Sequence, residues 1–130
     1  MCVRSTPSTA REATALISEI REYVAMPGRL PDVIAFFHED VIPLFHKHGM
    51  EFTQMGVTTI GDNSFGEFVY TMRFADLAEM EQKWGAFVAD PGFGSALAAR
   101  EAKGPLYRAI RRRVIDSGQF DHLLGDLTSD

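Results

Sequence analysis

His48 is the side chain of this sequence best suited to acid–base chemistry, because a buried imidazole titrates near neutral pH. It ends the segment 30–48, in which apolar residues recur every three or four positions, as on one face of a helix. That stripe consists of Leu30, Ile34, Phe37, Val41, Leu44, Phe45 and His48. We therefore expect His48 to point inward and to serve as the catalytic residue. The alternative is a core histidine bonded to a backbone carbonyl near the helix end, where positive charge is also favoured.

The spacing of the histidines argues against a metal site on this helix. His46 and His48 are two residues apart and point to different sides of a helix. His38 lies roughly 15 Å from His48 along the axis, at 1.5 Å per residue. Cys2 is the only cysteine, which excludes an intrachain disulfide and a cysteine-based metal cage. We predict no metal and no tightly bound cofactor.

A second group of polar residues alternates along a predicted strand: Glu19, Arg21 and Tyr23 share one of its faces. Because the guanidinium fork of arginine suits a carboxylate, this face could bind an anionic substrate. The alternative, which we favour, is a set of cross-strand or intersubunit salt bridges. The run Arg111–Arg113 does not indicate nucleic-acid binding, since alternation turns Arg112 to the opposite face and the chain has a net charge of −5.

The predicted core is rich in aromatic side chains. They are Phe37, Phe45, Phe68, Tyr70, Phe74, Trp84 and Phe87. Most of these rings are expected to pack between sheet and helices, and the functional alternative is an apolar ligand pocket at the same place. In that pocket Tyr70 and His48 are the polar groups. Trp84, Arg21 and Phe45 complete the predicted substrate-binding set.

Periodicity and turn residues predict the elements that position these side chains. Strands are expected over 16–23, 50–60, 65–74 and 107–115, and helices over 30–48, from Asp76 to about residue 90, and over 93–102. Pro43 predicts a bend in the first helix, and Gly49 suits its C-terminal cap. The order strand, helix, strand, strand, helix, strand is the split βαβ plan of ferredoxin-like domains. We predict an α+β fold with a four-stranded antiparallel sheet and helices on one face.

The second helix carries its own start and stop signals. Asp76 followed by Glu79 resembles a capping box, and Asp90–Gly92 is expected to end the helix. Its apolar stripe consists of Leu77, Met80, Trp84, Phe87 and Val88.

Length and composition indicate one globular domain, since 130 residues with 45% hydrophobic and 24% charged side chains are typical of a folded chain. We expect a flexible arm at 1–13, the domain at 14–116 and a tail at 117–130, whose Phe120, Leu123 and Leu124 dock on the body or on a partner. The uncovered face of the sheet predicts a homodimer that stacks sheet on sheet. No apolar run approaches the roughly 20 residues of a membrane span, and the first residues lack the apolar stretch of a secretory signal. A cytoplasmic protein is expected.

Five short segments together resemble the NIPSNAP family. They are Glu19–Tyr23, Pro27–Leu30, His46–Gly49, Trp84–Phe87 and Asp90–Pro91, and the resemblance spans residues 16–115. It implies a dimeric α+β barrel, in agreement with the order of elements. It does not imply a reaction, because proteins with this barrel include cofactor-free monooxygenases, haem-handling enzymes and small isomerases, and fold is a weak guide to function.

Two functions follow as hypotheses. The first is a small-molecule protein, an enzyme without a tightly bound cofactor that acts on an apolar or aromatic metabolite between sheet and helices. The second is a non-catalytic homodimeric interaction module with a filled core, and haem or metal handling is a less favoured third. An enclosed space of several hundred Å³ beside His48 would support the first, and a filled core would support the second.

Overall fold

The structure is a computed structural model and describes residues 17–62, 64 and 66–120. In chain order the elements are β1 (Ile17–Ala25), α2 (Leu30–Phe36), a π-helical turn η2 (Phe37–Val41), α3 (Ile42–Lys47), β2 (Glu51–Val57), β3 (Phe68–Phe74), α4 (Leu77–Ala89), α5 (Pro91–Arg100), β4 (Tyr107–Asp116) and a 3-10 turn η3 (Gly118–Phe120). This order confirms the predicted plan. The predicted arm at 1–13 lies outside the described residues, and the domain boundaries at 14 and 116 stay predictions.

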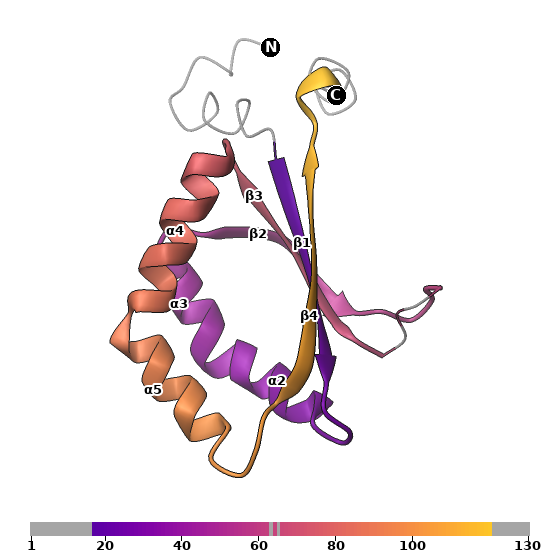
Figure 1. The fold of residues 1–130 in the computed structure, drawn as a ribbon, viewed down its shortest axis with the longest axis vertical. Helices are drawn as coiled ribbons and strands as arrows, with labels where there is room; N and C mark the ends of the chain where they lie inside the picture. The colour runs from indigo at the N-terminus through magenta and orange to yellow at the C-terminus, as the bar shows by residue number, and fades with distance from the viewer. Residues whose placement is uncertain (1–16, 63, 65, 121–130) are drawn as a thin grey trace.

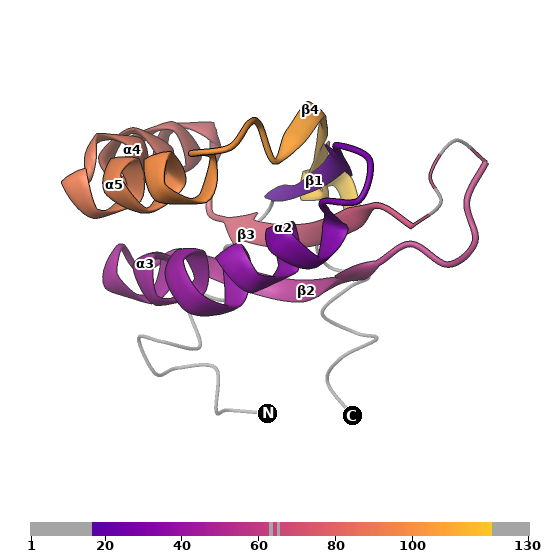
Figure 2. The same ribbon diagram turned by 90° about the horizontal axis from the view of Figure 1, so that it is seen from below.

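The strands form one four-stranded antiparallel sheet in the order β2-β3-β1-β4. β1 is central, because it pairs with β3 on one side and with β4 on the other. The described helices lie against one face of the sheet and leave the other face open (Figure 1). They form two arms, α2 with α3 and α4 with α5, which face each other (Figure 2). The predicted ferredoxin-like α+β fold is confirmed.

Alternation along the central strands decides which side chains face the helices. In β3 every second residue from Phe68 to Phe74 is buried, and the residues between them are partly exposed. β1 presents its predicted set to the same side, namely Ile17, Glu19, Arg21 and Tyr23. The covered face of the sheet therefore combines an aromatic strand with a strand that carries a carboxylate and a guanidinium.

The β2–β3 hairpin is confirmed, but both strands are shorter than predicted. The Thr58 N–H donates to the Glu67 carbonyl at 2.9 Å, and the Gly66 N–H donates to the Thr58 carbonyl at 2.8 Å. Gly66 has a φ of 73°, a backbone conformation that favours glycine. These bonds close the connecting loop from residue 58 onward, so the regular ladder ends at Val57 and resumes at Phe68.

The first helix contains a π-helical turn directly before Pro43. Proline has no N–H to offer to the carbonyl four residues earlier, which in a regular α-helix is that of Glu39. Here the helix widens instead, and the Ile42 N–H donates to the Phe37 carbonyl, five residues back. The sequence predicted a disturbance at this place as a bend, and the structure has an inserted π turn.

The π turn also corrects the predicted inward face of this helix. Val33, Phe37, Val41 and Phe45 are buried at a spacing of four residues, together with Phe36. A regular helix of 3.6 residues per turn would let such a row drift around the axis, whereas a wider turn keeps it aligned. The predicted stripe members Leu30, Ile34, Leu44 and His48 are only half-buried.

Both helices of the second arm begin with an aspartate cap. The Asp76 carboxylate accepts from the Glu79 N–H at 2.8 Å, and the Glu79 carboxylate accepts from the Ala75 N–H at 2.7 Å. Asp90 accepts from the Gly92 N–H at 2.8 Å, with Pro91 in the first turn of α5. Asp90–Gly92 thus ends α4 as predicted and also starts α5, two residues before the predicted Phe93.

The stripe predicted for α4 is correct only in part. Met80 and Phe87 are buried and Trp84 is half-buried, but Leu77 and Val88 are 60% and 61% exposed. All five residues lie on one side of α4, and the side chains at its two ends border a cavity instead of the packed core.

The open face of the sheet carries cross-strand ion pairs. The Arg111 Nη1 lies 3.1 Å from the Glu22 carboxylate and 2.5 Å from that of Glu67. Arg73 pairs with Glu51 on β2 at 2.6 Å.

In the part of the chain that the structure describes, no helix is long and apolar enough to cross a membrane. Phe120 is 56% exposed in the single chain, and the other two tail residues predicted to dock, Leu123 and Leu124, lie outside the described residues.

Candidate functional site

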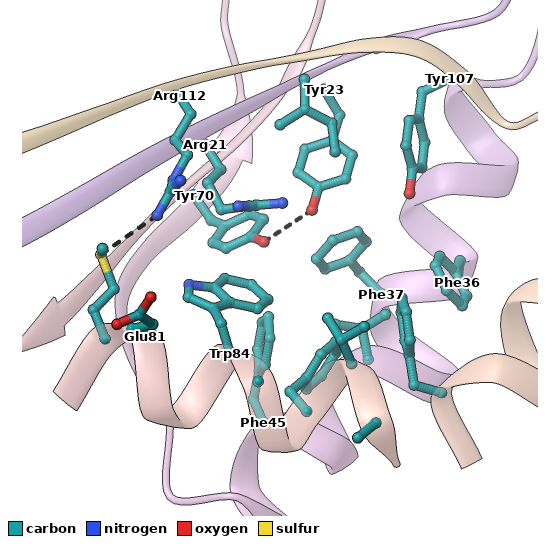
Figure 3. Close-up of a pocket in the computed structure, with 18 of the residues that line it drawn as sticks. Arg21, Tyr23, Phe36, Phe37, Phe45, Tyr70, Glu81, Trp84, Tyr107 and Arg112 are labelled. Atoms are coloured by element: carbon teal, nitrogen blue, oxygen red, sulfur yellow. Dashed lines mark hydrogen bonds between the residues drawn. The ribbon is translucent and has the colours of Figure 1, made fainter. Parts of the chain in front are cut away.

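A cavity of about 850 Å³ lies between the covered face of the sheet and the two helical arms (Figure 3). The strands contribute Arg21, Tyr23, Tyr70, Tyr107, Ile110 and Arg112, and the helices contribute Phe36, Phe37, Val41, Phe45, Leu77, Met80, Glu81, Trp84, Gly85, Phe87, Val88, Ala89 and Phe93. The helical side is mostly apolar, whereas the hydroxyl and guanidinium groups come from the sheet. This volume lies within the range of small-molecule sites.

Aromatic rings form the apolar walls. Phe37, in η2, packs edge-on to Tyr23 with ring centroids 5.3 Å apart. Phe45, in α3, lies 5.2 Å from Phe87 of α4, and both are buried. Because each ring is held by another ring from a different element, the walls present rigid, flat apolar surfaces. Such surfaces suit a planar, aromatic guest.

Glu19 organises the polar end of the site. Its side chain is fully buried, and its Oε1 accepts from the Trp84 Nε1 at 2.6 Å. Its Oε2 accepts from the Arg21 Nη1 at 3.2 Å and also from the Arg112 Nε. A buried carboxylate is tolerated only when its charge is compensated and its oxygens are bonded, and both conditions are met here. Glu19 therefore positions three cavity-lining side chains without lining the cavity itself.

Arg21 is held between this carboxylate and two aromatic rings. Its Cζ lies 4.4 Å from the centroid of Trp84 and 5.8 Å from that of Tyr23. Burial by itself lowers the pKa of Arg21, but Tyr23, Tyr70 and Glu19 outweigh it and raise that pKa above its ordinary value. The guanidinium is therefore charged at any physiological pH. Its Nε is buried and has no hydrogen-bond partner among the described residues.

Two tyrosine hydroxyls meet beside Arg21. The Tyr23 and Tyr70 oxygens are 3.0 Å apart, and both rings are buried (Figure 3). Burial, reinforced by Tyr23, raises the pKa of Tyr70 well above its ordinary value, so this phenol keeps its proton. Burial also raises the pKa of Tyr107 to about 12. The site thus presents neutral hydroxyls as hydrogen-bond donors next to a fixed cation.

His48 lies outside the residues that line the cavity. Its Nε2 is 2.7 Å from the Asp90 Oδ2, at the junction of α3 with α5. The Lys47 Nζ contacts the same oxygen at 2.8 Å. Bonds from Lys47, His48 and the Gly92 N–H lower the pKa of Asp90 below its ordinary value. The partner of His48 is thus a helix-capping carboxylate, not the backbone carbonyl of the alternative we considered.

His38 and His46 do not line the cavity either. The His46 ring stacks on Phe52 at 6.3 Å, and His38 is exposed. Among the described residues no group of three His, Cys, Asp or Glu side chains is placed to hold a metal ion.

Four of the five predicted site residues come together in the cavity, namely Arg21, Phe45, Tyr70 and Trp84. His48 does not join them, and its catalytic role stays a prediction. Sequence reasoning missed the part that Arg112 plays, although alternation within Arg111–Arg113 had already turned this residue away from its neighbours. The organising role of Glu19 was also missed, because no pattern in the sequence links it to Trp84.

Comparison with known proteins agrees with this geometry. The family model described as NIPSNAP matches residues 18–120, which is most of the chain. The chain belongs to the NIPSNAP family. A search of curated proteins found no match.

Solved NIPSNAP structures share the fold of this chain. An Agrobacterium tumefaciens NIPSNAP family protein of unknown function is 19% identical with a TM-score of 0.67, over 79% of this chain and 88% of its own. An uncharacterised NIPSNAP-like domain protein from Burkholderia xenovorans is 17% identical with a TM-score of 0.68, over 78% and 84%. A second A. tumefaciens NIPSNAP family protein is 17% identical with a TM-score of 0.67, over 77% and 90%. At these identities the likeness concerns the fold alone.

Proposed function

We propose that this NIPSNAP protein binds an apolar, aromatic metabolite in the cavity between sheet and helices and acts on it as an enzyme that needs no tightly bound cofactor. The observation that carries this proposal is the cavity itself, about 850 Å³ in volume and walled by rings from both helical arms. This space opens to solvent between the arms and does not adjoin His48, and its size and aromatic walls favour a small-molecule ligand over an interaction module with a filled core.

The polar end supplies the chemistry. A neutral tyrosine hydroxyl beside a fixed guanidinium can donate a hydrogen bond to a ligand oxygen and stabilise negative charge that develops there. Tyr23 and Tyr70 fit this role, because their hydroxyls meet within the cavity and the raised pKa of Tyr70 keeps its proton in place. We propose that Arg21, Phe45, Tyr70 and Trp84 bind the metabolite, with the tyrosine pair, in place of His48, as the hydrogen-bond donor to the reacting oxygen.

The experiment blocks the cavity at a glycine. Gly85 lines the cavity on α4, and a Cβ placed there meets no atom within 4 Å. Gly94 on α5 has the same free space but does not line the cavity, so it provides a matched control. N-phenyl-1-naphthylamine, a neutral aromatic dye that fluoresces in apolar sites, serves as the probe. Dye binding to the wild type and to Gly94→Phe, with loss in Gly85→Phe, is expected. Equal binding by both variants, or none by the wild type, would refute the proposal.

We also propose that two copies stack through the open face of the sheet. Ile20 and Val69 are half-buried at the centre of this face, between the ion pairs of Arg111 and Arg73. An interface above roughly 1,200 Å² in total is expected. Light scattering should give a dimer for the wild type and for the exposed helix variant His38→Arg, but a monomer for Ile20→Arg. The cytoplasmic location expected from the sequence stays a prediction.

A further inference from the structure

The polar end of the cavity contains more hydrogen-bond donors than acceptors. Arg21 has five N–H groups, of which one on Nη1 is directed to Glu19, and its Nε is buried without a partner among the described residues. Both oxygens of Glu19 are already occupied by Trp84, Arg21 and Arg112. The carboxylate at the centre of this cluster already accepts three hydrogen bonds, while the Arg21 Nε is without a partner among the described residues.

The tyrosine pair adds a further donor. Two hydroxyls carry two hydrogens, and the contact of 3.0 Å between Tyr23 and Tyr70 uses one of them. The second hydrogen is free for an acceptor supplied from the cavity. Either hydroxyl can donate within the pair, so either can offer the free hydrogen to a ligand.

A charged guanidinium is the main donor at this end of the cavity. Arg21 and the fully buried Glu19 carry opposite charges. Arg112, whose side chain is 46% exposed, and Glu81, which is exposed on α4, also carry opposite charges, and water screens both. The inner end of the cavity is therefore left with unused donors on a charged group, and such donors bind anionic acceptors more strongly than neutral ones.

We infer that the guest of this cavity is an aromatic carboxylate, whose rings lie among Phe37, Phe45 and Phe87 and whose carboxylate contacts Arg21 and the Tyr23–Tyr70 pair. A carboxylate supplies the missing acceptor, and the guanidinium fork of Arg21 suits a carboxylate in geometry and in charge. A neutral aromatic guest would leave Arg21 buried and partly unbonded. This inference rests on the proposed function and specifies its ligand class.

The test compares two probes with the same naphthalene ring, the anion 2-naphthoate and its neutral methyl ester, by calorimetric titration, and Arg21→Met separates the effect of charge from that of the added methyl group. The wild type should bind the acid more tightly than the ester by about tenfold or more, as expected for hydrogen bonds to a charged group. Arg21→Met should abolish this preference while the ester still binds. Arg108→Met removes the same charge from an exposed residue near the start of β4 that does not line the cavity, and should retain the preference.

The outcomes distinguish failure of the proposed function from failure of the inference alone. If neither probe binds the wild type, the proposed function fails together with the inference. If the ester binds at least as tightly as the acid, or if Arg21→Met retains the preference, the cavity binds aromatic compounds but the inference is wrong. If Arg21→Met does not fold, Tyr70→Phe decides: the preference falls if the hydroxyl pair contacts the carboxylate, and an unchanged preference overturns the inference.

Discussion

Two carboxylates in this protein each accept bonds from three groups, but the two clusters hold different parts of the molecule in place. Glu19 receives hydrogen bonds from Trp84, Arg21 and Arg112, and Asp90 receives them from His48, Lys47 and the Gly92 N–H. Both are buried, and each joins elements that are distant in the sequence. Glu19 ties the sheet to α4, whereas Asp90 ties α3 to the start of α5.

The difference between the two clusters lies in what their partners touch. Arg21, Trp84 and Arg112 all line the cavity, so Glu19 sets the geometry of the candidate binding site. The partners of Asp90 do not line the cavity and hold a helix junction together. A histidine on a buried carboxylate resembles a catalytic pair, but position relative to the cavity, and not the pairing itself, is what separates the two clusters.

The largest effect is expected from Glu19→Ala. Removal of the carboxylate leaves Arg21 buried without its counter-charge, and should lower the free energy of unfolding by about 3–5 kcal/mol. Urea denaturation measures this change. Glu22→Ala is the control, because Glu22 is on the opposite face of the same strand and pairs with the solvent-exposed Arg111. A similar loss of unfolding free energy in both variants would show that the carboxylate on the covered face of β1 contributes no more to stability than the one on the open face.

A smaller effect, with a distinct pH dependence, is expected from Asp90→Asn. The folded-state pKa of Asp90 lies below that of an unfolded aspartate, about 4, so the ionised carboxylate stabilises the fold above that pH. The contribution is lost as the pH falls toward the folded-state pKa. The wild type should therefore exceed Asp90→Asn in urea midpoint at pH 7, with a gap that narrows below about pH 4. A gap independent of pH would contradict this assignment.

The smallest effect should come from His48→Gln. The amide of glutamine can still donate to Asp90, so the melting temperature should fall by less than in Asp90→Asn, and binding of N-phenyl-1-naphthylamine should not change. Trp84→Phe is the comparison, since it removes the hydrogen bond from the Trp84 Nε1 to Glu19 and should weaken binding of the dye. Loss of dye binding or of turnover in His48→Gln, with little loss of stability, would restore His48 as the catalytic residue.

Much of the candidate site was predictable because strands alternate with a period of two. That period places Arg21 and Tyr23 on one face of β1 and makes Tyr70 part of the buried face of β3. Phe45 and Trp84 followed from the helical stripes. His48 was assigned from the same kind of stripe, and there the prediction of an inward position was only partly met, because the π turn before Pro43 keeps the buried row on Val41 and Phe45.

The sequence by itself determined the order of the elements, the faces of β1 and β3, and the capped start of α4. These features depend on residues a few positions apart, for which backbone periodicity and local hydrogen bonding are sufficient. Only the tertiary structure decided which carboxylate serves the cavity. Glu19 meets Trp84 across 65 residues and Arg112 across 93, and His48 meets Asp90 across 42. Such contacts depend on how the helical arms dock on the sheet, which packing of the whole chain determines.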